Sequence, residues 1–330
     1  MDFSGKDFLR ILDFSEEELR YILDVAKKFK EMKHAGQNHK YFPNKNIAII
    51  FEKTSTRTRC AFEVAGYDLG MNVTYLDPTG SQMGHKESIA DTARVLARFY
   101  DGIEFRGFKQ ETVNDLAKYA DVPVWNGLTD SCHPTQALAD FMTMEEKLGS
   151  LKGKTLAFVG DTHNNVSNSL MAMSAKMGVN YIACGPAALK PSDEIVAACQ
   201  PIAAKNGCTI TITEDINALK DKADALYADV WLSLGEDKEK WGERITQLKP
   251  YQVNMAMMKS AKPGAIFLHC LPSFHDLNTS IARDVHEKYG IAEMEVTNEV
   301  FESEHSVVFD EAENRMHTIK AIEYLTLKDN

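Results

Sequence analysis

Residues 46–59 read Asn-Ile-Ala-Ile-Ile-Phe-Glu-Lys-Thr-Ser-Thr-Arg-Thr-Arg, and this stretch decides the fold of the N-terminal half. The apolar, β-branched run 46–51 predicts a buried strand, and the segment 60–70, which ends in glycine, predicts a helix. The turn between them combines hydroxyls and arginines with free N–H groups and the positive end of the helix dipole, so it suits a phosphate-sized dianion. The alternative is that Ser55 or Thr56 only caps the helix while the arginines are solvated. The glycine and lysine spacing of a P-loop is absent.

Composition limits the class of protein. The chain has 330 residues, enough for two domains, and a net charge of 37 − 48 = −11, which argues against nucleic acid as a partner. No apolar run approaches the roughly 18 residues that a membrane helix needs, and the first residues lack a signal-peptide pattern. The six cysteines include no Cys-x-x-Cys pair, so we expect reduced thiols, no zinc site and a cytoplasmic protein.

Strand and helix patterns alternate through both halves of the chain, with the best domain boundary at residues 149–154. Strand-like runs occupy residues 46–51, 73–77, 102–105, 122–125, 155–159, 181–184, 209–212, 225–227 and 265–268. Such alternation is typical of α/β proteins, and we expect each half to be a doubly wound parallel sheet covered by helices.

Reactive side chains follow several of these strands, where open α/β sheets bind ligands. Arg106 comes directly after one strand, although a lone arginine there is often only solvated. His133 and Gln136 open a helix and could share a ligand or merely cap it. Asp229 could hold an ammonium group or cap the next segment. Cys270 ends an apolar strand, where cysteine is usually a small core residue.

The turn at residues 160–165, Gly-Asp-Thr-His-Asn-Asn, tests whether the chain is a nicotinamide enzyme. Thr162 and Asn165 stand where the second and third glycines of a dinucleotide fingerprint belong. A pyrophosphate is therefore not expected at this turn, and the asparagines suit a small polar ligand instead.

Taken together, these motifs resemble those of the carbamoyltransferase family. The segments 55–59 (Ser-Thr-Arg-Thr-Arg), 133–136 (His-Pro-Thr-Gln) and 269–272 (His-Cys-Leu-Pro) match its carbamoyl-phosphate motifs in order and spacing. Asp229 with the segment 233–235 (Ser-Leu-Gly), and the asparagine pair 164–165, resemble the ornithine branch. Leu234 replaces the usual methionine, an apolar change of similar volume from which we expect a small effect.

The resemblance implies two doubly wound domains with a cleft between them. Residues 1–148 bind carbamoyl phosphate, the C-terminal helix 311–330 packs back on this domain, and residues 149–310 bind ornithine. The resemblance also implies that Gln82 reaches a neighbouring subunit's site, so the protein is a trimer or a multiple of trimers. Neither a metal nor an organic cofactor is implied.

The same resemblance assigns the site residues. The implied catalytic residues are Arg57, Arg106, His133, Asp229 and Cys270. The implied carbamoyl-phosphate ligands are Ser55, Thr56, Arg57, Thr58, Gln82, Arg106, His133, Gln136, Cys270, Leu271 and Arg315. The implied ornithine ligands are Asn165, Asp229, Ser233 and Leu234.

The implied reaction converts carbamoyl phosphate and L-ornithine to L-citrulline and phosphate, in arginine synthesis or arginine breakdown. A transferase acting on putrescine or N-acetylornithine shares the phosphate motifs, but the segment from Asp229 to Gly235 argues against it. A non-catalytic binding relative is expected to lack a motif, and none is missing.

Overall fold

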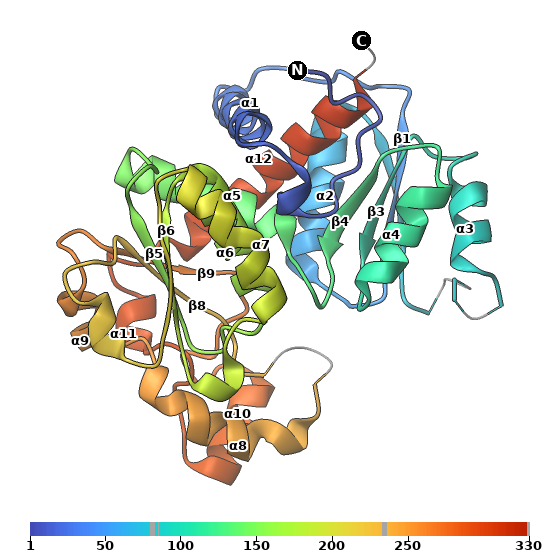
Figure 1. Ribbon diagram of the computed structural model, residues 1–330. Coiled ribbons are helices and arrows are strands. Elements are labelled where there is room, and N and C mark those ends of the chain that lie inside the picture. The colour runs from blue at the N-terminus through green and yellow to red at the C-terminus, as the bar shows by residue number, and fades with distance from the viewer. Residues whose placement is uncertain (80–82, 85, 233–235, 329–330) are drawn as a thin grey trace. The chain divides into compact units, whose positions relative to one another are not determined.

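The computed structural model describes residues 1–79, 83–84, 86–232 and 236–328, and it contains two compact units. The first, unit 1, comprises Met1–Met142 together with Ala312–Asn330; the second, unit 2, comprises Thr143–Glu311. Both contain a parallel sheet with helices between the strands, so the α/β prediction is confirmed (Figure 1). No helix in the described part of the chain is long and apolar enough to cross a membrane.

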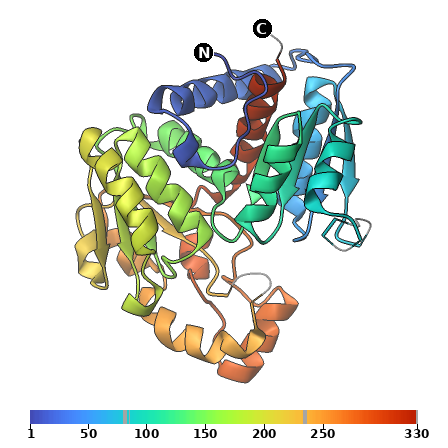
Figure 2. The ribbon, with the colours of Figure 1, turned by 45° about the vertical axis from the view of Figure 1, so that its right-hand side comes forward.

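The sheet of unit 1 has four parallel strands in the order β2-β1-β3-β4. Their bounds are β1 Asn46–Phe51, β2 Asn72–Leu76, β3 Gly102–Arg106 and β4 Val124–Leu128. The helices that begin in this part of the chain, with α12, are η1 Ile11–Asp13, α1 Glu16–His34, α2 Thr56–Leu69, α3 Ile89–Leu96, α4 Gln110–Tyr119, α5 Pro134–Leu148 and α12 Val308–Leu327. Helices α3 and α4 lie together on one face of the sheet, and α2 and α12 lie on the other (Figures 1 and 2).

Helix ends in unit 1 follow from local sequence. Ser15 and Glu18 form the reciprocal capping box that starts α1. Ser55 caps α2, because its hydroxyl accepts a hydrogen bond from the Thr58 N–H, and Gly70 ends the same helix with φ 93°.

Helix α12 is the central helix of unit 1. It is unusual in burying polar residues, and among those with no exposed area are Asn314, His317, Thr318, Lys320 and Glu323. The indole of Trp125 donates to Thr326 Oγ1 at 3.0 Å, which joins the helix to β4. Partners offset the cost of burying several of these groups: Lys320 pairs with Asp68 at 2.5 Å, and Asn314 accepts a hydrogen bond from Lys30 at 2.8 Å.

The sheet of unit 2 has five parallel strands in the order β7-β6-β5-β8-β9. Their bounds are β5 Thr155–Val159, β6 Asn180–Cys184, β7 Ile210–Thr213, β8 Ala225–Ala228 and β9 Ile266–His269. The accompanying helices are α6 Asn165–Met177, η2 Ala187–Leu189, α7 Asp193–Lys205, η3 Ile216–Leu219, η4 Lys238–Lys240, α8 Trp241–Leu248, η5 Lys249–Tyr251, α9 Met255–Ser260, α10 Ser280–Tyr289 and α11 Asn298–Phe301. In Figure 1, α6 and α7 lie together on one face of this sheet, and α9 and α11 on the other.

Several element bounds differ from the sequence-based expectation. The strands predicted over 209–212 and 265–268 each lie one residue later, at Ile210–Thr213 and Ile266–His269. The strand predicted over 122–125 starts only at Val124, since Pro123 has no N–H for the ladder. These differences do not move the strand ends that carry the site.

Candidate active site

The carboxyl ends of three strands meet at one edge of the unit 1 sheet. In the register of the sheet, Phe51 at the end of β1 lies beside Arg106 at the end of β3, and Arg106 lies beside Leu128 at the end of β4. The segments that follow these strands carry the predicted phosphate-binding residues, so the fold brings them to one edge.

The Thr58 side chain contacts two arginines. Its Oγ1 accepts hydrogen bonds from Arg106 Nη1 at 3.3 Å and from Arg315 Nη2 at 3.0 Å. Arg106 is anchored a second time, because its Nε donates to the carbonyl of Lys53 at 3.2 Å. Arg315, from α12, also approaches Thr135 Oγ1 at 3.4 Å. Both guanidinium groups are therefore held at the first turn of α2, where an anion is also favoured by the helix dipole.

His133 is buried in the same group. Burial, and then the charges of Arg315, Arg106 and Arg57, hold the pKa of its imidazole well below the usual range. Its Nδ1 lies 3.4 Å from Thr135 Oγ1. The arrangement is thus a neutral imidazole among three guanidinium groups, and it suits a doubly charged anion that carries a neutral polar group.

Gln136 lies in the first turn of α5, three residues after His133. Its Nε2 donates to Asp140 Oδ1 at 2.8 Å, and both side chains are buried. This bond fixes the orientation of the amide, with Oε1 as the acceptor end for a ligand N–H.

Lys53 and Glu104 are two buried ionisable residues of unit 1 that sequence reasoning missed. The Lys53 ammonium forms an ion pair with Asp130 and lies 4.5 Å from the Phe108 ring centroid. The Glu104 carboxyl is fully buried; burial raises its pKa strongly, although Arg106 and Arg315 oppose that rise. The position of Lys53 directly after a strand was the available signal, whereas Glu104 lies inside an apolar strand and gave none.

A second cluster lies at the carboxyl edge of the unit 2 sheet. Asp229 Oδ2 accepts from Asn164 Nδ2 at 3.1 Å, and Asp229 Oδ1 accepts from the Cys270 thiol at 3.2 Å. Asn164 also caps α6 through its bond to the Ser167 N–H. Burial raises the pKa of Asp229, and His269 is the main group that opposes this rise. The cluster offers a carboxylate, an amide and a thiol to an amine ligand.

His269 has a different role from its neighbour Cys270. Its Nδ1 accepts from the Leu271 N–H at 2.9 Å, and its Nε2 lies 3.3 Å from Glu295 Oε1. Glu295 in turn accepts from the Phe274 N–H at 2.6 Å and from the Ser273 hydroxyl at 2.8 Å. These buried groups fix the backbone of the His-Cys-Leu-Pro segment, in which the Leu271–Pro272 peptide is cis. Nothing in the sequence around Glu295 pointed to it.

The predicted site residues divide between these two clusters. Thr56 is exposed at the start of α2, and Asn165 is the first residue of α6, so the neighbouring Asn164 is the one that contacts Asp229. Gln82, Ser233 and Leu234 lie outside the described residues.

The ligand atoms of Asp229, His269 and Cys270 lie within 4.8 Å of one another, a spacing that can hold a metal ion. In this structure the Asp229 carboxylate, the Cys270 thiol and His269 Nδ1 take part in the hydrogen bonds given above.

Comparison with known proteins places this geometry in context. One family model, described as the carbamoyl-P binding domain of aspartate/ornithine carbamoyltransferase, matches residues 6–146. Another, its Asp/Orn binding domain, matches residues 152–326. The catabolic ornithine carbamoyltransferase of Treponema denticola is 61% identical, over 98% of this chain and 96% of its own. The ornithine carbamoyltransferase of Staphylococcus aureus strain Mu50 is 56% identical over 98% of each chain. The solved structure of the Pyrococcus furiosus ornithine carbamoyltransferase superposes with a TM-score of 0.90 at 41% identity, covering 99% of this chain and 98% of its own.

Proposed function

The chain belongs to the aspartate/ornithine carbamoyltransferase family, and from that premise we propose how its residues perform the reaction. It is an ornithine carbamoyltransferase: carbamoyl phosphate and L-ornithine give L-citrulline and phosphate. We assign carbamoyl-phosphate binding to residues 1–148 with 311–330, and ornithine binding to residues 149–310.

The convergence of Arg57, Arg106 and Arg315 on Thr58 and His133 is the observation that carries this proposal. Ser55, Thr56, Thr58 and the arginines hold the phosphate group, together with Gln82 from a neighbouring subunit. As the C–O bond to phosphate breaks, negative charge grows on the leaving oxygen, and guanidinium groups fixed in advance stabilise it without reorganising.

His133 acts on the carbamoyl group as a neutral hydrogen-bond donor. Since its pKa is held far below neutrality, the imidazole donates a hydrogen bond to the carbamoyl oxygen without giving up a proton. Arg57 and Thr58 support this polarisation. The Gln136 amide oxygen and the Leu271 carbonyl accept from the carbamoyl nitrogen and so set the plane of the group.

Ornithine is held by unit 2 and attacks through its neutral δ-amine. Asn165, Asp229, Ser233 and Leu234 bind its amino-acid end, and Cys270 with Asp229 places the δ-amine. The amine adds to the carbamoyl carbon, the tetrahedral intermediate expels phosphate, and the nitrogen loses a proton to give citrulline. Positioning and charge stabilisation supply the acceleration, with no covalent enzyme intermediate.

A substrate comparison tests the assignment. Acceptor-dependent release of phosphate from carbamoyl phosphate is measured with ornithine, putrescine, N-acetylornithine or aspartate as the acceptor, and the carbamoylated product is identified in each case. We expect kcat/KM to favour ornithine by orders of magnitude. A preference for another amine would refute the ornithine assignment while leaving the phosphate site intact, and carbamoyl-phosphate binding by calorimetry would then locate the error in unit 2.

We further propose that the enzyme is a cytoplasmic trimer or multiple of trimers with shared sites. The support is the family resemblance of the loop that carries Gln82, and the free cysteines of the described residues. Mixing inactive Gln82→Ala and Arg106→Ala proteins under subunit exchange should restore part of the activity, because some hybrid sites receive neither change. Proven exchange without recovery would place Gln82 in its own subunit's site.

The proposed cellular direction is catabolic, with citrulline and phosphate giving ornithine and carbamoyl phosphate. Two similar proteins, from Treponema denticola and Mycoplasma capricolum, carry the word catabolic in their names, at 61% and 56% identity. Cells that lack the gene should then accumulate citrulline when arginine is supplied, because the step that consumes citrulline is lost. A strain that instead required added arginine would indicate the biosynthetic direction.

A further inference from the structure

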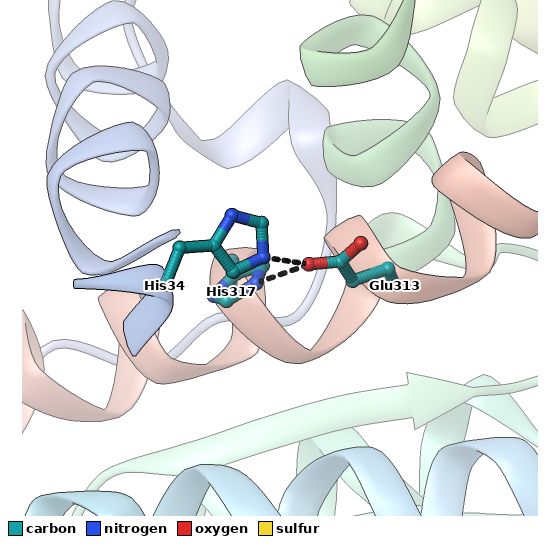
Figure 3. Close-up of side chains that lie close together, drawn as sticks. All are labelled: His34, Glu313 and His317. Carbon is teal, nitrogen blue, oxygen red and sulfur yellow. Dashed lines mark hydrogen bonds and ion pairs between the residues drawn. The ribbon is translucent and has the colours of Figure 1, made fainter. Parts of the chain in front are cut away.

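Three side chains from two helices of unit 1 converge on one point, apart from the residues assigned to catalysis (Figure 3). His34 lies in the last turn of α1, and Glu313 and His317 lie one turn apart on α12. The Oε1 atom of Glu313 is 2.7 Å from His34 Nε2 and 3.2 Å from His317 Nε2. All three ligand atoms lie within 4.8 Å of one another.

Two imidazoles and one carboxylate form a ligand set that Zn²⁺ uses in proteins, with water in the fourth position. Ligand bonds of about 2.0–2.2 Å in a tetrahedron place donor atoms roughly 3.3–3.5 Å apart. The donor spacing of this cluster is close to that value, so a small outward shift of the side chains makes room for the ion. His34 is mostly exposed, which allows that shift and gives the ion an entry path.

Two features of the surroundings limit the affinity. Lys30, one turn before His34 on α1, lies near enough to act on the charges of Glu313 and His317, and its ammonium donates to Asn314 Oδ1 at 2.8 Å. Metal binding at His317 Nε2 also moves the ring proton to Nδ1, which is buried without a hydrogen-bond partner in the described residues. A ligand histidine usually donates from this nitrogen, so affinity should be moderate.

We propose that His34, Glu313 and His317 form a binding site for a divalent transition-metal ion of the Zn²⁺ type that joins α1 to α12. Arg315 lies between two of the ligands on α12 and donates to Thr58 from this helix. The ion would therefore fix the segment that delivers Arg315, although it takes no part in the reaction.

The test uses the full chain, stripped of metal with a chelator, in a Cys270→Ser background that removes the thiol near Asp229. Zn²⁺ binding is measured by calorimetry, and Co²⁺ binding by visible absorption. We expect one ion per chain, a cobalt spectrum without a sulfur charge-transfer band, and a higher unfolding temperature with metal.

Variants locate the ion. His34 is exposed, so His34→Ala should fold normally, yet its affinity for the metal should fall by more than the roughly 10–100-fold that is lost when a ligand loses its own hydrogen-bond partner. Glu313→Gln should behave similarly, and Lys30→Gln should tighten binding because it removes a nearby cation. His275→Ala is the matched control: it also removes a histidine, a partly buried one that is bonded to Asn298, and should bind as the parent does. Absence of binding, or equal affinity in the parent and His34→Ala, would overturn the proposal.

Discussion

Replacing Arg106 by lysine keeps a positive charge at the carboxyl end of β3 but removes the planar guanidinium. The Arg106 side chain makes two fixed contacts, from Nε to the Lys53 carbonyl at 3.2 Å and from Nη1 to Thr58 Oγ1 at 3.3 Å. These contacts aim the remaining edge of the fork at the phosphate. A single ammonium cannot reproduce both contacts and also bind an oxygen of the ligand in the same orientation.

The fall in kcat/KM caused by Arg106→Lys can be estimated from these contacts. A hydrogen bond from a charged donor contributes about 1.5–3 kcal/mol, so two contribute about 3–6 kcal/mol. At about 1.36 kcal/mol for each factor of ten, kcat/KM for carbamoyl phosphate should fall by about 10²–10⁴-fold. Arg106 is partly exposed and the lysine retains its charge, so the lower end of that range is expected.

The assay is citrulline formation at saturating ornithine over a series of carbamoyl-phosphate concentrations. Arg59→Lys is the matched control, because Arg59 is next to Thr58 on α2 but pairs with Glu63 at 2.9 Å and stacks on the Tyr75 ring. It should stay within about threefold of the parent, and both variants should unfold at the parent's temperature. If Arg106→Lys retained near-parental kcat/KM, the convergence of arginines on Thr58 would not be the phosphate site.

Three further outcomes are expected. Arg57→Lys should lower turnover by about 10²-fold or more with the fold intact, because the fork is again lost; calorimetry with carbamoyl phosphate checks the cause. For ornithine, kcat/KM should rise nearly tenfold per pH unit from pH 7 to 9, because the neutral amine attacks and the pKa of such an amine is about 10.4; a flat profile would contradict selection of the neutral amine. In acid, kcat/KM should fall further as Asp229, whose pKa is raised, becomes protonated. Cys270→Ser should lower kcat/KM for ornithine at every pH, yet the variant should still bind carbamoyl phosphate. Burial raises the pKa of Asp7 to about 6 in the folded protein, so the contribution of Asp7 to the stability of the fold is present below its unfolded pKa of 3.8 and is lost as pH rises through 6. Asp7→Asn keeps an acceptor for the Val124 N–H, and it should raise the unfolding temperature by a few degrees at pH 7 but not at pH 4.

The alternation of strands and helices, and the strand ends that carry function, were predictable because each depends on local sequence. Strand β1 and the Ser55 cap of α2 follow directly from apolar and hydroxyl residues in the chain. The meeting of Arg315 with Thr58 was expected only from the family resemblance, since the two are 257 residues apart and no local pattern links them.

Positions that act through tertiary contacts were missed. Glu295 supports the His-Cys-Leu-Pro segment through His269 and Ser273, but its own sequence neighbourhood contains no sign of this. Asn164 and Asn165 were equivalent in sequence, and only the start of α6 makes Asn164 the residue that contacts Asp229. A one-residue choice of helix cap is below the precision with which sequence patterns locate helix ends.

Because Ala312–Asn330 belongs to unit 1, the two segments of that unit are synthesised at different times, with all of unit 2 made between them. A ribosome finishes Met1–Met142 and then all of unit 2, with the first turn of α12, before the rest of that helix is made. Until then Thr58 has no Arg315 beside it, and the indole of Trp125 lacks Thr326. The nascent chain should therefore complete unit 2 first, and the anion site should form only after α12 has been synthesised. A chain truncated before α12 is expected to be a substrate for chaperones and proteases rather than a weak enzyme.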